Sequence, residues 1–525
     1  MEDVTAQLVR ASLALRGIRP TAAEHDIMLD DPRGLAALVD GWLVEPEFAA
    51  TVRDLHAETW LTRMTHRDRL PASGVLAWAD RGALASALGE STLVFAERVV
   101  VDRRPYTELV TAEETWVDEH VALVLGLPFE AGGPEWQIGN PVDGRSAAGI
   151  LSQDTLWMRH ITGDANRQRA RAEFIADRLL CDPFSTRDLP VTDLSGSLDA
   201  VSVDPACTSC HEDLDPIAST IFGFRRYVLS TEMVEAYANG CEDPAFCYPI
   251  QMWVPETEGT GPDWGMPEPG WFGEPLANVG ALGLAVAQDP RFASCTARRF
   301  RAWLHQVDPD SLDDEVVQVD ADALVASDWD AAALLRDLVL ADDFVGTEAV
   351  GPLAVRPESL ARQVEAATGF GWHVNPHPFG CTLLGCSRDV DLLNDARDGF
   401  RVLAGGIDGY DVIEPSLAPA PTRALVVRRL AEGAADFVVD DDFGKLAEDR
   451  RLLTLIERDG NGENKVRAQL VALHLRLLGE RVTPISPAVD EDVALWGAVF
   501  FRSGGSAAWR AVIAALLQDP RAVTY

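Results

Sequence analysis

The amino-acid sequence has 525 residues, enough for about two to four domains that each bury a core of their own. Its 45 Lys and Arg stand against 83 Asp and Glu, so the formal net charge is −38, and we expect neither nucleic acid nor an anionic lipid surface to be a main partner. The longest apolar run, LANVGALGLAVA, is about two thirds of the ~18 residues that span a bilayer, which predicts that no segment is integral to a membrane.

The first part of the chain has the pattern of amphipathic helices. In ASLALRGIRP a helix is predicted to end at the Gly and Pro residues, and Thr21 is the predicted N-cap of the next helix. Apolar residues then recur at spacings of three and four over 35–43 and 54–64. A helical region near 111–127 is followed by the Gly- and Pro-rich stretch LPFEAGGPEWQIGNPVDG, which indicates a surface connection. We therefore predict an N-terminal helical domain over 1–128.

Helical patterns return in the middle and C-terminal parts. Residues 147–181 are predicted to be helical, and apolar residues recur at helical spacing over 214–224. The Gly-, Pro- and Trp-rich stretch 238–275 predicts an ordered loop. The helix pair in ALGLAVAQDPRFASCTARRFRAWL closes a predicted domain over 146–306, and amphipathic helices predict one or more helical domains over 311–525. Strand signals are few, so the predicted fold class is mainly α and multidomain.

The stretch DPACTSCHEDLDP contains the pattern C-x-x-C-H, formed by Cys207, Cys210 and His211. Two thiols at this spacing can form thioethers with the two vinyl groups of one porphyrin, and the adjacent imidazole can supply an axial nitrogen to its iron. We therefore expect one covalently attached c-type haem in the 146–306 domain, between the helical domains. The alternatives are a local disulfide, or half of a zinc site, followed by an incidental histidine, but the sequence has no second C-x-x-C to complete a zinc site.

The other six cysteines indicate in which cellular compartment the protein is located. Their even number and spacing predict disulfides, with the pairs Cys241/Cys247, Cys381/Cys386 and, by elimination, Cys181/Cys295. The alternative is that several are free buried thiols. Disulfides and haem attachment both belong outside the cytoplasm, so we expect a periplasmic, extracellular or cell-surface protein. Because the start MEDVTAQLVR lacks the basic and apolar regions of a signal peptide, we expect an export signal outside this sequence or a misplaced start codon.

Several segments carry a resemblance together. The N-terminal helical domain of one family is similar to LALRGIRPTAAEHD and LVDGWLVEPEF. The segment before its haem motif is similar to AGILSQDTLWMRH and RAEFIADRLLC, and the haem motif itself to CTSCHEDLDP. The helix pair that closes its haem domain is similar to DPRFASCTARRFRAWL. FRVLAGGIDGYDV and VIAALLQDPRAVTY resemble its C-terminal part more weakly. The chain thus resembles the multidomain planctomycete-type cytochrome c proteins, large exported bacterial proteins of mostly unassigned activity. The resemblance implies a c-type haem domain between helical domains.

The sixth position of the iron decides between electron transfer and small-ligand chemistry. The segment WMRHITG, which the resemblance places just before the haem motif, supplies His160 and then Met158 as candidate distal ligands, and Met266 in the Trp-rich loop is the third choice. The alternative for each is a structural role, since a single Met often fills a core and a single His often packs there. A guanidinium can bind a haem propionate in bidentate geometry. The candidates for that contact are Arg171, Arg225 and Arg226, and the alternative is that these side chains face solvent.

A competing metal site lies in HVNPHPFGCTLLGC, whose zinc-type ligands are His373, His377, Cys381 and Cys386. Their spacing matches no common zinc finger, and the two thiols of an exported protein would readily be oxidised.

The leading hypothesis is a monohaem c-type protein that transfers single electrons to an unidentified redox partner. The alternatives are a haem-dependent oxidoreductase with an unidentified substrate and a haem-free, disulfide-linked surface interaction protein, so whether the protein is an enzyme stays open.

Overall fold

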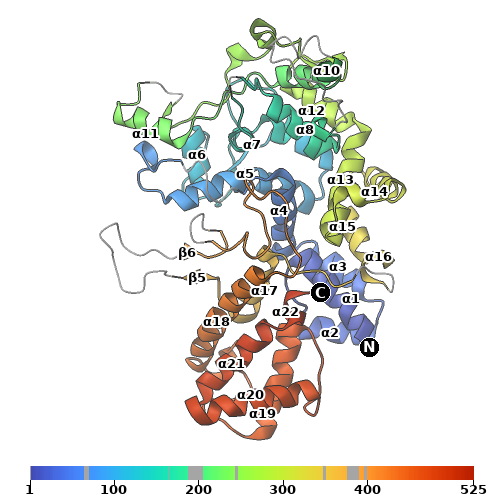
Figure 1. The fold of residues 1–525 in the computed structure, drawn as a ribbon, viewed down its shortest axis with the longest axis vertical. Coiled ribbons are helices and arrows are strands. Elements are labelled where there is room, and N and C mark those ends of the chain that lie inside the picture. Colours follow the sequence, from blue (N-terminus) through green and yellow to red (C-terminus); the bar gives the residue numbers. More distant parts are fainter. Residues whose placement is uncertain are drawn as a thin grey trace. The chain divides into compact units, whose positions relative to one another are not determined.

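Nearly all of the regular secondary structure in the described residues is helical. The computed structural model describes residues 2–63, 70–163, 165–186, 205–242, 246–346, 351–374, 390–394 and 399–525 (Figure 1). Helices make up 60% of the structure and strands 3%, which confirms the predicted mainly α class. The named strands of this described part pair as antiparallel two-stranded sheets with two residues in each strand.

The described residues form two compact units. The central unit is Leu55–Trp303 with Val307–Leu334, and the terminal unit is Met1–Asp54 with Leu304–Gln306 and Leu335–Tyr525. The division predicted from sequence order, 1–128, 146–306 and 311–525, stays a prediction. None of the helices in the described ranges is both long enough and apolar enough to cross a lipid bilayer.

The central unit contains the predicted haem motif. Its elements are η1 (Gly74–Leu76), α5 (Arg81–Val101), η2 (Tyr106–Val110), β1 (Trp116–Val117), α6 (Glu119–Leu125), β2 (Gln137–Ile138), η3 (Gly149–Ser152), α7 (Asp154–Arg159), α8 (Arg169–Leu180), η4 (Phe184–Thr186), α10 (Pro205–Thr220), α11 (Ser230–Ala238), η6 (Pro255–Thr257), η7 (Gly261–Trp264), β3 (Gly270–Trp271), β4 (Glu274–Pro275), α12 (Val279–Gln288), η8 (Pro309–Ser311) and α14 (Asp314–Ala326).

The terminal unit combines the two ends of the chain. Its elements are α1 (Glu2–Arg16), α2 (Ala22–Asp30), α3 (Leu35–Trp42), α16 (Asp342–Val345), α17 (Pro357–Thr368), β5 (His373–Val374), β6 (Val390–Asp391), α18 (Pro421–Phe443), η9 (Ala447–Asp449), α19 (Glu463–Leu473), the π-helical turn η10 (His474–Leu478), α20 (Pro487–Ser503), α21 (Gly505–Leu517) and α22 (Pro520–Val523). Three further helices contribute residues to both units: α4 (Pro46–Trp60), α13 (Pro290–His305) and α15 (Ala331–Leu340).

A local sequence signal accounts for where helix α2 begins. The hydroxyl of Thr21 accepts the backbone N–H of Glu24 at 3.2 Å, and the Glu24 carboxylate accepts the backbone N–H of Thr21 at 2.6 Å. This reciprocal capping box satisfies two donors that the first turn of α2 cannot pair internally. It confirms the N-cap predicted at Thr21.

Helices α18, α20 and α21 form the centre of the core of the terminal unit. Val438 and Val439 of α18 and Trp509 and Val512 of α21 are all 0% exposed. Because α18 and α21 each turn an apolar face toward the other, these side chains leave water together. Burying one such side chain fully contributes about 1.5–3 kcal/mol to folding.

A buried carboxylate holds the segment that follows α18. Asp442 is 0% exposed, and its two carboxylate oxygens accept the backbone N–H groups of Arg451, Leu452 and Leu453 at 2.7, 2.9 and 2.8 Å. A buried charge is unfavourable unless it is hydrogen-bonded, so these contacts allow Asp442 to stay inside the unit.

A buried histidine joins the end of α19 to α20. His474 is 1% exposed; its Nε2 lies 2.7 Å from Oδ2 of Asp492, and its Nδ1 lies 3.3 Å from Oε2 of Glu480. Burial lowers the pKa of His474, but the hydrogen bonds to the two carboxylates outweigh that effect and raise the pKa above its ordinary value.

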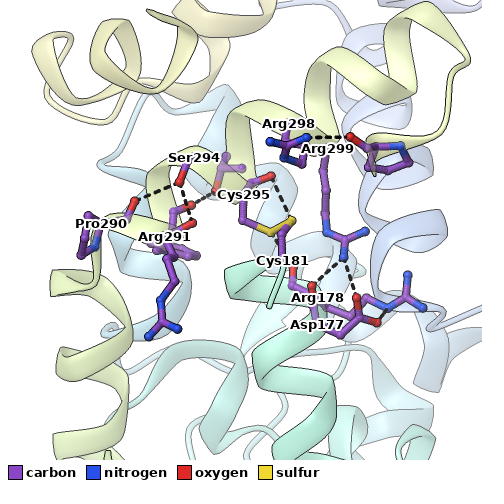
Figure 2. Close-up of a disulfide and its surroundings, with 12 residues drawn as sticks. Asp177, Arg178, Cys181, Pro290, Arg291, Ser294, Cys295, Arg298 and Arg299 are labelled. Atoms are coloured by element: carbon purple, nitrogen blue, oxygen red, sulfur yellow. Dashed lines mark hydrogen bonds and ion pairs between the residues drawn. A yellow bond between two sulfur atoms is a disulfide. The ribbon is translucent and has the colours of Figure 1, made fainter. Parts of the chain in front are cut away.

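Two disulfides lie in the described part of the central unit. Cys181, at the C-terminal end of α8, is bonded to Cys295 of α13, and Cys241 is bonded to Cys247. Both pairings confirm the sequence prediction, whereas Cys381 and Cys386 lie outside the described residues. Figure 2 shows the first bond with Arg299 of α13 beside it; Nη2 of this arginine donates to the carbonyl and to the carboxylate of Asp177 in α8 at 2.6 and 3.1 Å. The helices α8 and α13 are therefore joined by a covalent bond and an ion pair.

Candidate haem-attachment site

The C-x-x-C-H motif lies in the first turns of α10. Cys207, Cys210 and His211 are spaced at three and four positions along a helix, so their side chains project from the same face. Cys207 is half-buried, while Cys210 is 7% exposed and its Sγ lies 3.6 Å from the carbonyl oxygen of Phe184, which accepts its S–H. The helix therefore presents two sulfurs and one imidazole together, as thioether attachment with an adjacent axial ligand requires.

The two cysteines of the motif are free thiols. Every other cysteine in the described ranges is in a disulfide, whereas Cys207 and Cys210 are bonded to no partner sulfur. The local disulfide considered from the sequence is therefore not formed in this structure. Free thiols are the form that can add to the vinyl groups of a porphyrin.

A carboxylate and a guanidinium lie behind the imidazole. Nδ1 of His211 is 2.9 Å from Oδ1 of Asp215, one helical turn later. Nε of Arg169, the first residue of α8, donates to the same Oδ1 at 2.7 Å, and its Nη2 donates to Oδ2 at 2.8 Å. Asp215 is only 6% exposed, so this bidentate ion pair is largely shielded from water.

The network determines which nitrogen of His211 is available. Burial alone would raise the pKa of Asp215, but the hydrogen bonds from Arg169 and His211 outweigh it and hold the pKa below its ordinary value. Asp215 is therefore an ionised acceptor, and Nδ1 of His211 is the donor. A neutral His211 then carries its lone pair on Nε2, the nitrogen that can bind a metal.

Of the three candidate distal ligands, Met266 is connected to this network. Its Sδ lies 3.8 Å from Nη2 of Arg169, and the residue is 5% exposed. Met158 lies in α7 and is also 5% exposed. The contacts of the described residues thus bring Met266, the third choice from the sequence, to the ion pair behind His211, on the Nδ1 side and away from the nitrogen that would bind iron.

His160 is held by other contacts. Its Nε2 donates to the carbonyl oxygen of Trp60 at 2.9 Å, and its ring lies 4.0 Å from that of Phe174, measured between centroids. Burial, with a further contribution from the charge of Arg159, lowers the pKa of His160 well below its ordinary value. The ring is therefore neutral, but Nε2 would have to leave the Trp60 carbonyl before it could bind iron.

Arg171 is saturated by contacts inside the protein. The side chain is 0% exposed. Its guanidinium donates to Oε1 of Gln168 and to four backbone carbonyl oxygens, at distances of 2.8–3.1 Å; the carbonyls belong to Trp157, His160, Phe224 and Arg225. All of its donor nitrogens are therefore engaged, and a propionate contact would have to replace one of these bonds. Arg225 is exposed, and Arg226 forms an ion pair with Glu232 at 3.2 Å.

The alternative zinc segment is described only in part. His373 is exposed at strand β5, while His377, Cys381 and Cys386 lie outside the described residues. Within the described ranges, no group of three or more His, Cys, Asp or Glu side chains is arranged to hold a metal ion. A haem iron takes its equatorial ligands from the porphyrin, so its attachment does not require such a group.

Neither Asp215 nor Arg169 was predicted from the sequence to contact the haem-attachment motif. Asp215 follows His211 by four positions on a predicted helix, and the i,i+4 rule was signal enough to place the two side chains together. Arg169 is 46 positions from Asp215, and no local pattern relates two residues so far apart.

No protein-family model matches the chain, and no curated protein or solved structure is significantly similar to it.

Proposed function

We propose that α10 carries one c-type haem and that the protein transfers single electrons outside the cytoplasm. The observation that carries the proposal is the state of the cysteines: four others pair as disulfides, while the two of C-x-x-C-H remain thiols beside an imidazole oriented by a carboxylate. In a compartment where disulfides form, thioether bonds to a porphyrin would keep two thiols at this spacing out of a disulfide.

The residues of α10 fit a haem of this kind. Cys207 and Cys210 would hold it through thioethers, and Nε2 of His211 would be its axial ligand. When bound, the haem would supply a one-electron couple. The protein fixes the orientation of the imidazole through Asp215 and keeps Cys210 and Asp215 largely away from water.

The disulfides support a location outside the cytoplasm. Cytosolic thiols are kept reduced, so two disulfides in the described chain favour the periplasm, the cell surface or the medium. Covalent haem attachment of this type belongs to the same compartments. The similarity to planctomycete-type cytochrome c proteins, proposed from sequence segments, fits that location.

A haem stain after denaturing electrophoresis tests the proposal. The protein is exported in a host competent for c-type maturation, and a reduced pyridine haemochrome spectrum is recorded. We expect a stained band with a bis-thioether spectrum for the wild type, and no stain for the double substitution Cys207→Ala with Cys210→Ala.

The matched control is the double substitution Cys241→Ala with Cys247→Ala. It also removes two cysteines from the central unit, and it leaves α10 intact. Its band is expected to stain like that of the wild type. A colourless wild-type protein, or stain that persists without Cys207 and Cys210, would refute the proposal.

The second candidate function is a haem-dependent oxidoreductase. The observation that favours it is that His160, the first candidate distal ligand, already donates its Nε2–H to the Trp60 carbonyl. If no side chain binds the sixth position, the wild type will give a high-spin spectrum and bind cyanide rapidly. A low-spin spectrum that becomes high-spin when either Met158 or Met266 is replaced by alanine would instead support electron transfer with that methionine as distal ligand.

A further inference from the structure

Two different side chains share the carboxylate that lies behind His211. A single buried carboxylate, Asp215, is shared by an imidazole and a guanidinium. Its Oδ1 accepts both Nδ1 of His211 at 2.9 Å and Nε of Arg169 at 2.7 Å. The two donors come from different helices, α10 and α8, which pack against each other.

The carboxylate and the guanidinium act on the imidazole in opposite directions. A carboxylate that accepts the Nδ1–H of a metal-binding histidine fixes its tautomer and makes Nε2 a stronger electron donor. A guanidinium bound to the same carboxylate withdraws part of its negative charge and weakens it as an acceptor. The donor strength of Nε2 is therefore set by the balance of two contacts.

We propose that Asp215 is a positioning residue that strengthens His211 as an axial ligand and lowers the reduction potential of the bound iron, and that Arg169 limits this effect. The inference rests on the proposed haem attachment. Stronger donation from the axial ligand stabilises the ferric state, so the potential falls as the hydrogen bond to the carboxylate strengthens.

Two substitutions test the proposal with opposite signs. Asp215→Asn keeps an oxygen near Nδ1 but removes the negative charge, so the midpoint potential is expected to rise. Arg169→Gln removes the guanidinium and leaves the whole charge of Asp215 to the imidazole, so the potential is expected to fall. Potentials are measured by spectroelectrochemistry on protein that stains for haem and retains the far-ultraviolet circular dichroism of the wild type.

Glu212→Gln is the matched control. Glu212 is adjacent to His211 on the same helix and is exposed, and its substitution also removes one negative charge. Because Glu212 is exposed, water and salt screen its charge, and no hydrogen bond to Nδ1 of His211 is lost with it. We therefore expect Glu212→Gln to shift the potential clearly less than Asp215→Asn does.

A measurement without haem separates this inference from the proposed function. In the haem-free protein, side-chain nitrogen NMR of labelled histidine reports the tautomer of His211, assigned by comparison with His211→Gln. We expect the Nδ1–H form in the wild type and a larger share of the Nε2–H form in Asp215→Asn.

Failure of haem attachment and failure of the present inference give different results. An unstained wild type refutes haem attachment, and the tautomer measurement then still decides whether Asp215 orients His211. A stained wild type in which Asp215→Asn moves the potential no more than Glu212→Gln overturns the present inference alone. So does a potential that rises in Arg169→Gln, or a His211 that carries its proton on Nε2 in the wild type.

Discussion

Removing the disulfide between Cys181 and Cys295 is expected to destabilise the central unit more than removing the one between Cys241 and Cys247. The first bond closes a loop with a sequence separation of 114 residues and the second one of 6 residues. If a disulfide acts by restricting the unfolded chain, these lengths correspond to about 5 kcal/mol for the long loop and about 2 kcal/mol for the short one. The expected difference is therefore about 3 kcal/mol.

The two double cysteine-to-alanine variants are expected to lose similar amounts of packing energy. Each pair contains one buried cysteine, Cys295 at 2% exposed and Cys247 at 5%, so substitution by alanine leaves a similar small cavity in both cases. Both double variants keep the thiols of α10. The difference between them therefore reports loop closure.

Hydrogen exchange at increasing urea concentration is a suitable assay, because it follows the amides of the central unit separately from the terminal unit. The free energy of the opening that exposes α5 and α8 is compared between the wild type and the two double variants. Equal losses, or a larger loss for the six-residue loop, would show that the chain-entropy reasoning does not hold for this protein.

Substitutions at three further positions probe buried polar contacts. Asp442→Ala leaves three backbone N–H groups without their acceptor and is expected to lower the free energy of unfolding of the terminal unit by about 3 kcal/mol or more in urea titrations, with Asp442→Asn losing less. Because its folded-state pKa is raised, His474 stabilises the folded state below the pKa of the unfolded imidazole and loses this contribution as the pH rises through the folded pKa. The free energy of unfolding that is lost in His474→Gln should therefore be larger at pH 5.5 than at pH 8.5 in urea titrations. Arg171→Lys should lower the melting temperature of the central unit, because a lysine cannot replace all five hydrogen bonds of the guanidinium, while the haem stain per folded molecule stays unchanged; an unchanged melting temperature would contradict this reasoning.

The features that the sequence predicted well depend on neighbours along the chain. The capping box at Thr21 uses residues three positions apart, and the disulfide between Cys241 and Cys247 closes a six-residue separation. The pairing of Cys181 with Cys295 was reached by elimination, because no local pattern relates positions 114 residues apart. Long-range pairing becomes visible only when the helices are packed.

The surroundings of the candidate haem-binding residues also depend on contacts between distant parts of the sequence, which local patterns do not predict. His160 has the residue type of an axial ligand, and its bond to the carbonyl of Trp60 arises from a contact 100 positions away along the chain. Arg171 has the charge and shape to bind a propionate, yet folding directs it to backbone carbonyls as distant as Phe224 and Arg225. Residue type indicates what a side chain can bind, and packing determines what it does bind.

Helix α8 connects these long-range features to the motif on α10. Arg169 and Cys181 lie at its two ends, about 18 Å apart for 12 residues at the rise of an α-helix. One end carries the guanidinium that holds Asp215, and Arg171, a half turn further on, is tied to surrounding carbonyls; the other end is bonded to Cys295. A helix fixed at both ends is a rigid support for the ion pair, and the ion pair orients the imidazole beside the two thiols. The five-residue motif supplies the reactive groups, and a helix from an earlier part of the chain supplies their geometry.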